Sequence, residues 1–198
     1  MAEQRSDKTH SRILNSAAIA FAEHGYDGAS VAEICRRAEV SKGAFYHHFP
    51  SKQDVFLELL QGWLSELDTE LMKLQRGHSS VPEKLLHMTE LIRRVFQAAE
   101  DQLSIFLEFW SQATHDPVVW EATIAPYERY RAFFARMVRS GIDEGTLQPV
   151  DPDTTARVIV SLALGLVLQG LMDAEGTDWG EVGQRGIRML LEGIQTWE

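Results

Sequence analysis

The segment from Ser41 to His48 concentrates side chains that could bind a phosphate backbone and read base edges. If the segment is a helix, a cation, two small residues, a phenol and two imidazoles share its outer face. Lysine and small residues suit close contact with phosphates, whereas tyrosine and histidine can hydrogen-bond to bases. The outward positions are Lys42, Gly43, Ala44, Tyr46, His47 and His48. A solvated helix face is the alternative interpretation of this pattern.

Two short helices and a tight turn would position this face. Ser30 followed by Glu33 is a capping box, in which each side chain satisfies the other residue's backbone amide. Apolar residues then recur at i, i+3, i+4 and i+7 and form one helical face: Val31, Ile34, Cys35 and Ala38. Glu39 and Val40 make the turn. The second helix is capped by Ser41 and pinned inward by Phe45 and Phe49, so the spacing predicts a helix-turn-helix over about 30–49.

A longer helix precedes this motif and another follows it. Helical apolar spacing covers residues 7–24, Gly25 ends that helix as a left-handed cap, and residues 26–28 form a loop. After Pro50 a helix over about 52–75 would be roughly 35 Å long at 1.5 Å per residue. We expect this long helix to act as a lever between the motif and the rest of the chain.

The remainder of the chain also shows helical periodicity. Pro126 lies inside one of its patterns, and a kink or break is expected there because proline removes a backbone donor. No alternating strand pattern of useful length occurs. The predicted helices cover about residues 82–100, 105–115, 117–141, 152–174 and 178–196. The predicted fold class is all-α with about nine helices.

Composition and charge are those of a globular intracellular protein. Of the 198 residues, 44% are hydrophobic and 24% charged, and Cys35 is the one cysteine, so no intrachain disulfide forms. The polar N-terminus lacks the apolar core of a signal peptide, and the apolar run at 158–172 is too short to span a bilayer. We therefore expect a cytoplasmic protein with no membrane partner.

The net charge of −10 is unevenly distributed. Residues 1–50 carry six basic and six acidic side chains, whereas residues 51–198 carry thirteen and twenty-three. The neutral first segment permits DNA binding without establishing it. The acidity of the second segment hints at cationic ligands, although solvated surface charge explains it equally well.

Residues 9–68 resemble the N-terminal signature of the TetR family of bacterial transcriptional regulators. The resemblance requires the helix order and several motifs to coincide: Gly25, Ser30, Val40-Ser41-Lys42-Gly43, Phe45-Tyr46 and Phe49-x-x-Lys52. It implies a DNA-binding domain at 1–52 and a ligand-binding and dimerisation domain at 53–198. By resemblance, Ser41, Lys42, Gly43, Ala44, Tyr46, His47 and His48 contact operator DNA, with Ser30 and Lys52 on phosphates.

The resemblance also implies that the final two helices form a homodimer interface. Residues on their apolar stripes are Val158, Leu162, Leu166, Leu190, Leu191 and Ile194. Members of the family commonly enclose an effector pocket with their middle helices, and an aromatic set could line it here, although ordinary core packing explains the set equally well. The candidate effector residues are Trp63, Phe96, Phe106, Phe109, Trp110, Tyr127, Tyr130, Phe134 and Gln169.

Other chemistries find little support in the sequence. Glu83, His87 and Glu90 share one helix face, but a solvated face explains them better than a metal site. No H-E-x-x-H motif, phosphate-binding glycine loop or nucleophile elbow occurs, so neither an enzyme nor a cofactor is expected.

The function predicted is a dimeric regulator that binds double-stranded operator DNA, a repressor released from a near-palindromic site by a small lipophilic effector. One alternative is a regulator without a small-molecule effector. Another is a helical ligand-binding protein that has lost DNA binding. The effector, the operator, the regulated genes and the sign of regulation do not follow from the sequence.

Overall fold

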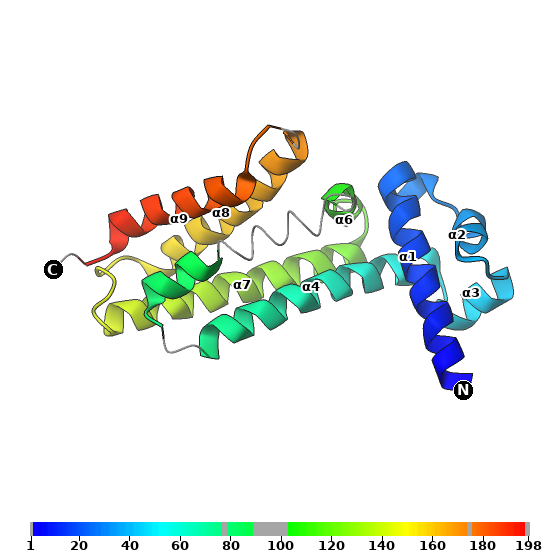
Figure 1. Cartoon of the computed structure of the whole chain (residues 1–198), viewed down its shortest axis with the longest axis horizontal. Helices are drawn as coiled ribbons and strands as arrows, with labels where there is room; N and C mark the ends of the chain where they lie inside the picture. The colour runs from blue at the N-terminus through cyan, green and yellow to red at the C-terminus, as the bar shows by residue number, and fades with distance from the viewer. Residues whose placement is uncertain (1, 77–78, 89–102, 174–175, 197–198) are drawn as a thin grey trace. The chain divides into compact units, whose positions relative to one another are not determined.

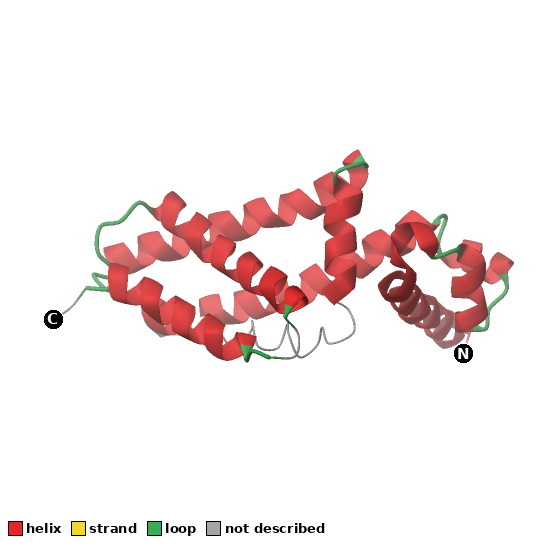
Figure 2. Cartoon of the chain, turned by 90° about the horizontal axis from the view of Figure 1, so that it is seen from above, coloured by secondary structure: helices red, strands yellow, loops and turns green. Residues whose placement is uncertain are grey.

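Helices account for nearly all of the regular structure (Figures 1 and 2). A computed structural model describes residues 2–76, 79–88, 103–173 and 176–196, and in these ranges β-structure is limited to one isolated bridge between Leu147 and Gln195. The helices are α1 (Ala2–Gly28), α2 (Val31–Ala38), α3 (Lys42–His48), α4 (Lys52–Arg76), α6 (Leu103–Ala113), α7 (Pro117–Asp143), α8 (Pro152–Met172) and α9 (Trp179–Ile194), with 81–88 also helical. The all-α prediction is confirmed.

Polar side chains cap the first turns of four helices, including the two caps predicted from the sequence, Ser30 and Ser41. Ser30, Ser41, Asp151 and Asp178 each accept a hydrogen bond from the backbone N–H three residues later, at 2.7 to 3.1 Å. Such caps satisfy one of the four backbone N–H groups that have no partner within the helix. The helix boundaries are therefore set largely by local sequence.

Gly25 interrupts α1. Its φ of 69° is positive, as predicted, but its ψ of 171° lies outside the left-handed helical region, in a range that is almost restricted to glycine. Residues 26–28 were expected to form a loop but remain helical after the kink. This kink directs the chain toward Ser30 and the start of α2.

Of the kink or break expected at Pro126, the break is wrong. Proline 126 lies inside α7, which continues through it as one helix from Pro117 to Asp143. The missing N–H removes one backbone bond. Burial of apolar side chains on both sides, Val119 before the proline and Phe134 and Val138 after it, offsets that loss.

The chain divides into two compact units. The first unit contains residues 1–66 and 101–124, and the second contains residues 67–100 and 125–198. The sequence placed the domain boundary after residue 52, whereas the first compact unit extends along α4 and also includes α6. The core of the first unit is rich in aromatic side chains, and Phe21, Phe45, Phe49 and Phe56 are each at most 2% exposed.

The core of the second unit is mainly aliphatic. Its largest fully buried side chains are Val81, Leu85, Val138, Leu147 and Ile159. Helices α8 and α9 pack against each other over this core (Figure 1). None of the described helices is long and apolar enough to cross a membrane.

Candidate DNA-binding site

Helices α2 and α3 are joined by a turn with unusual backbone geometry. Glu39 ends α2 with φ 50° and ψ 47°, a left-handed conformation that is rare for a residue with a side chain. Arg12 of α1 donates to the Glu39 carboxylate at 3.0 Å, and the Val40 N–H donates to the Cys35 carbonyl at 3.0 Å. These contacts help to hold the turn that directs α3 away from α2.

The inner face of α3 is anchored by two rings. Phe45 is fully buried and Phe49 is 2% exposed, so the predicted inward orientation is confirmed. Cys35 is buried as expected, and burial raises the pKa of its thiol. Because α3 has only seven residues, its orientation depends on these anchors rather than on its own stability.

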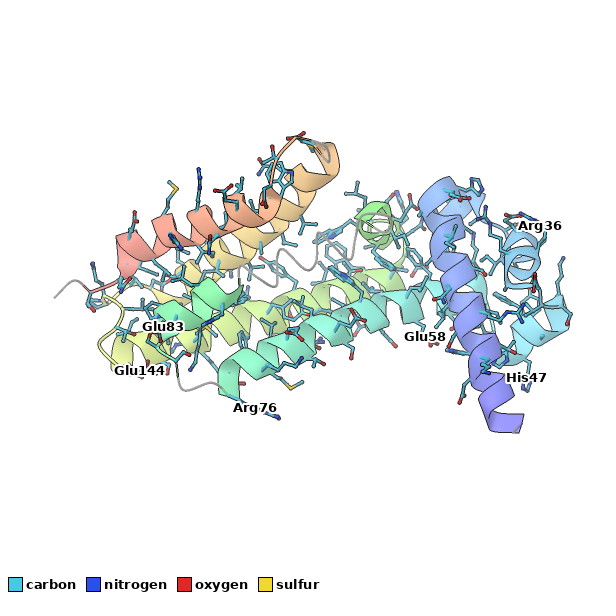
Figure 3. All side chains as sticks on the ribbon, in the orientation of Figure 1. Arg36, His47, Glu58, Arg76, Glu83 and Glu144 are labelled. Atoms are coloured by element: carbon cyan, nitrogen blue, oxygen red, sulfur yellow. The ribbon has the colours of Figure 1, made fainter. Side chains whose placement is uncertain are left out.

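The outer face of α3 is open. Ser41, Lys42, Gly43, Tyr46 and His47 are exposed, with Tyr46 at 53% (Figure 3 labels His47). A Cβ added at Gly43 would meet only the Ser41 hydroxyl, at 3.8 Å. Packing within the chain therefore does not require glycine at this position, and the small residue leaves room for a DNA strand to approach closely.

Ala44 and His48 lie at the edge of this face and are half-buried. The His48 ring has its centroid 5.3 Å from that of His47 and 5.9 Å from that of His10 on α1. Burial, together with the two neighbouring imidazoles, lowers the pKa of His48. Its ring therefore turns toward the protein more than the sequence suggested.

Lys52 is engaged within the protein. Its ammonium donates to the carbonyls of Tyr26 at 2.6 Å and Ala29 at 3.0 Å, and lies 4.2 Å from the centroid of the Tyr26 ring. Burial lowers the pKa of this amine. These contacts tie the start of α4 to the segment that leads into α2, so the geometry favours an intramolecular role over the predicted phosphate contact.

Glu108 of α6 binds the same segment from another side. Its carboxylate accepts the Tyr26 N–H at 2.8 Å, and a Cβ at Gly25 would lie 3.2 Å from the other carboxylate oxygen. Phe109, next to Glu108, packs on Phe56 with ring centroids 4.3 Å apart. Patterns of nearby residues cannot predict this link, because 82 residues separate the donor from the acceptor.

A charged cluster covers the outer side of α2. The Glu33 carboxylate accepts from Arg36 and Arg37, and Arg37 also pairs with Glu23 (Figure 3 labels Arg36). Hydrogen bonds from Arg36 and then Arg37 lower the pKa of Glu33 to about 2. Glu33 is thus bound to arginines instead of completing the expected reciprocal cap, which Ser80 and Glu83 do complete in the second unit.

The candidate effector residues are divided between the two units. Trp63, Phe109 and Trp110 belong to the first unit, whereas Tyr127, Tyr130, Phe134 and Gln169 belong to the second. Phe109 and Phe134 are buried, Gln169 is exposed and donates to the Gly165 carbonyl, and the remaining four are half-buried. Phe96 and the side chain of Phe106 lie outside the described part of the structure.

Tyr130 has a buried hydroxyl with no hydrogen-bond partner among the described residues. Burial, followed by the nearby negative charge of Asp68, raises the pKa of this phenol. Asp68 itself pairs with Arg129 at 3.1 Å. An unpaired buried hydroxyl is costly, so a ligand or water that hydrogen-bonds to it would be favoured.

The candidate interface residues differ in accessibility. Val158 is 46% exposed, Leu162, Leu190 and Ile194 are half-buried, and Leu166 and Leu191 are each 3% exposed. The last two pack inside the chain and are not accessible to a partner. Apolar side chains that the sequence reading did not select are exposed instead on α8 and α9: Leu168, Met172, Val182 and Met189.

The chain thus contains a capped helix-turn-helix whose second helix is polar and accessible. This arrangement is typical of DNA-binding proteins that place the second helix in the major groove. Two family models match the chain: "Bacterial regulatory proteins, tetR family" over residues 13–59 and "BetI-type transcriptional repressor, C-terminal" over residues 81–194. The chain therefore belongs to the TetR family of transcriptional regulators, whose members are DNA-binding proteins and not enzymes.

Individual relatives agree with this assignment. The transcriptional regulator UidR of Escherichia coli is 25% identical over 197 residues, covering 98% of this chain and 96% of UidR. The transcriptional repressor AcnR of Corynebacterium glutamicum is 34% identical over 117 residues, covering 56% and 54%. A transcriptional regulator from Saccharomonospora viridis, solved in complex with choline, shares the fold with a TM-score of 0.83 and 24% identity, covering 96% of this chain and 100% of that one.

Proposed function

We propose that the protein is a homodimeric repressor that reads a near-palindromic operator with α3 in the major groove. The observation that carries this proposal is the outer face of α3, where Lys42, Tyr46 and His47 are exposed around Gly43. Lys42 would bind phosphate, while Tyr46 and His47 would meet base edges. A dimer would place its two recognition helices roughly 34–36 Å apart, one turn of B-DNA.

The exposed stripes of α8 and α9 support dimerisation. On α8, Val158, Leu168 and Met172 lie on one helical stripe with Gly165, whose added Cβ would meet nothing within 4 Å. On α9, Val182 and Met189 are seven residues apart, so they share a helix face. Apolar stripes of this kind are stabilised when a second copy covers them. We therefore propose that the interface uses the exposed apolar side chains of α8 and α9, namely Val158, Leu168, Met172, Val182 and Met189. Leu166 and Leu191 are assigned to the core.

A small molecule is proposed to release the repressor. The S. viridis neighbour holds choline, so choline is the first compound to test. Aromatic rings and carboxylates attract quaternary ammonium groups, and Tyr130 is placed with Asp68 in the second unit. An effector bound in the second unit would have to change the arrangement of the DNA-binding helices to release the operator. It can do so only if its affinity differs between the arrangement that binds DNA and the arrangement that does not.

Selection of duplexes from a random DNA library tests the proposed function. The purified protein should enrich a near-palindromic sequence, and a scrambled duplex of equal length is the control. Lack of enrichment at low salt would contradict DNA reading and support a ligand-binding protein.

Titration of the enriched complex with choline tests the effector. Release by choline, lost in Tyr130→Leu but kept in Tyr127→Leu, would support a cationic effector bound at the Tyr130 ring. If the protein stayed bound to DNA at millimolar choline, the proposal that choline is the effector would be contradicted.

A further inference from the structure

His10 of α1 lies where α1, α4 and the end of α3 meet. Its ring is stacked on that of Phe49, with centroids 4.6 Å apart and planes inclined by 24°. The His48 ring packs on it edge-to-face, with centroids 5.9 Å apart and planes inclined by 69°. On α4, Glu58 places a carboxylate oxygen 3.1 Å from His10 Nε2, and Figure 3 labels Glu58 where α4 passes α1. One imidazole of α1 thus contacts side chains of two other helical segments, the end of α3 and α4.

The contact with Phe49 bears directly on α3. The Phe49 N–H donates to the Phe45 carbonyl at 2.9 Å and closes the last turn of the helix. A helix of two turns has little stability of its own, so the direction in which Phe49 is held decides how α3 is rotated. Phe49 is 2% exposed, and the His10 ring forms part of what covers it.

Glu58 in turn holds the imidazole. The Glu58 carboxylate lies beside one ring nitrogen, Nε2, and this contact favours ring orientations that turn Nε2 toward α4. The pair is partly exposed, at 32% and 41% for the two side chains, so its own contribution to stability is small. Its effect is on geometry: the ring is held in the plane that stacks on Phe49.

We infer that His10, anchored by Glu58, is a positioning residue that sets the orientation of α3 through Phe49 and His48. The ring of His47, on the outer face, contacts that of His48, with ring centroids 5.3 Å apart. A small rotation of α3 would therefore move His47 and Tyr46 together relative to base edges. The expected effect on DNA binding rests on the proposed DNA-reading role of α3. The expected effect on the orientation of α3 does not depend on that role.

Three variants separate the two contacts of His10. His10→Ala removes both, His10→Phe keeps the stacked ring and loses the Glu58 contact, and Glu58→Gln keeps the histidine and removes the charge. Asn15→Ala, at an exposed position of the same helix, is the matched control. Each protein is checked for an unchanged melting temperature before binding is measured.

Affinity is measured for the enriched duplex and for its scrambled version. His10→Ala should weaken binding to the enriched duplex by about threefold to tenfold, the loss expected for one ring contact, and change the scrambled duplex little. His10→Phe keeps the ring but loses the Glu58 contact, and Glu58→Gln weakens that contact, so each should lose only part of the affinity that His10→Ala loses. His10→Phe and Glu58→Gln should not be additive, because they remove the same contact. Equal losses on both duplexes, or no loss in His10→Ala, would overturn the inference.

Hydrogen exchange of the Phe49 amide without DNA provides a readout independent of the proposed function. His10→Ala should exchange this amide faster than wild type, while Asn15→Ala should not. If the wild type enriches no duplex, the proposed function fails, and faster exchange in His10→Ala still supports the positioning role. Unchanged exchange in His10→Ala would refute it.

Discussion

The α2–α3 pair and the α8–α9 pair each present an outer face, and the two faces have opposite chemistry. Around α3 the exposed groups are an ammonium, an imidazole and a phenol, from Lys42, His47 and Tyr46. Along α8 and α9 they are largely aliphatic or thioether groups, such as Val158, Val182 and Met189. Both pairs bury their inner faces in a core. The difference indicates a polar, anionic partner for one pair and an apolar partner for the other.

The largest expected effect concerns the anchor of the polar face. Phe45→Ala should destabilise the first unit by about 3–5 kcal/mol, because it leaves a cavity where a fully buried ring stood. Urea unfolding followed by circular dichroism measures the loss. Tyr46→Ala is the adjacent control, and should cost far less because Tyr46 is 53% exposed. Similar losses in both variants would show that α3 does not depend on its buried anchor.

The apolar face is tested by placing a charge on it. Met189→Glu should raise the dissociation constant of the homodimer on the order of a hundredfold, because the carboxylate would lose its water in the interface. Sedimentation velocity measures the change. Met72→Glu is the matched control, since Met72 is an exposed methionine of α4 at 49%. Equal effects of the two substitutions would exclude α9 as the interface.

The polar face is tested by removing its cation. Lys42→Ala should weaken binding to every duplex by roughly tenfold and reduce the salt slope by about one. Fluorescence anisotropy at several salt concentrations gives both values. Lys73→Ala, which removes an exposed lysine of the second unit, should change neither. Unchanged affinity in Lys42→Ala would contradict phosphate binding by α3.

The smallest effect compares two glutamates near helix starts, Glu33 in α2 and Glu83 in the helix over 81–88. The pKa of Glu33 falls from 4.5 to about 2 in the folded protein, so its contribution to stability is present above pH 4.5 and is lost as the pH falls toward 2. Glu33→Gln should therefore show a smaller loss of melting temperature over this interval than wild type. Glu83, whose pKa is also lowered, is held mainly by the Ser80 backbone N–H. If Glu83→Gln changed the acid profile more than Glu33→Gln, the assignment of the Glu33 shift to the arginines would be wrong.

Local sequence determined the helices and the inner face of the helix-turn-helix. Ser30 and Ser41 cap α2 and α3, and the i, i+4 spacing of Phe45 and Phe49 places both rings inside. These features follow from interactions within a few residues, which periodicity and capping rules describe. The resemblance of residues 9–68 to one family added the expected use of the outer face.

Tertiary structure alone decided which side chains are free to meet a partner. Lys52 is bound by two carbonyls more than twenty residues away in sequence, and Glu108 binds an amide 82 residues away. On α8 and α9, periodicity finds an apolar stripe but not its rotation, so Leu166 and Leu191 were expected outside and lie inside. The physical reason is the same in each case. Burial and long-range hydrogen bonds depend on what packs against a residue, and a residue's own neighbours in sequence do not specify that.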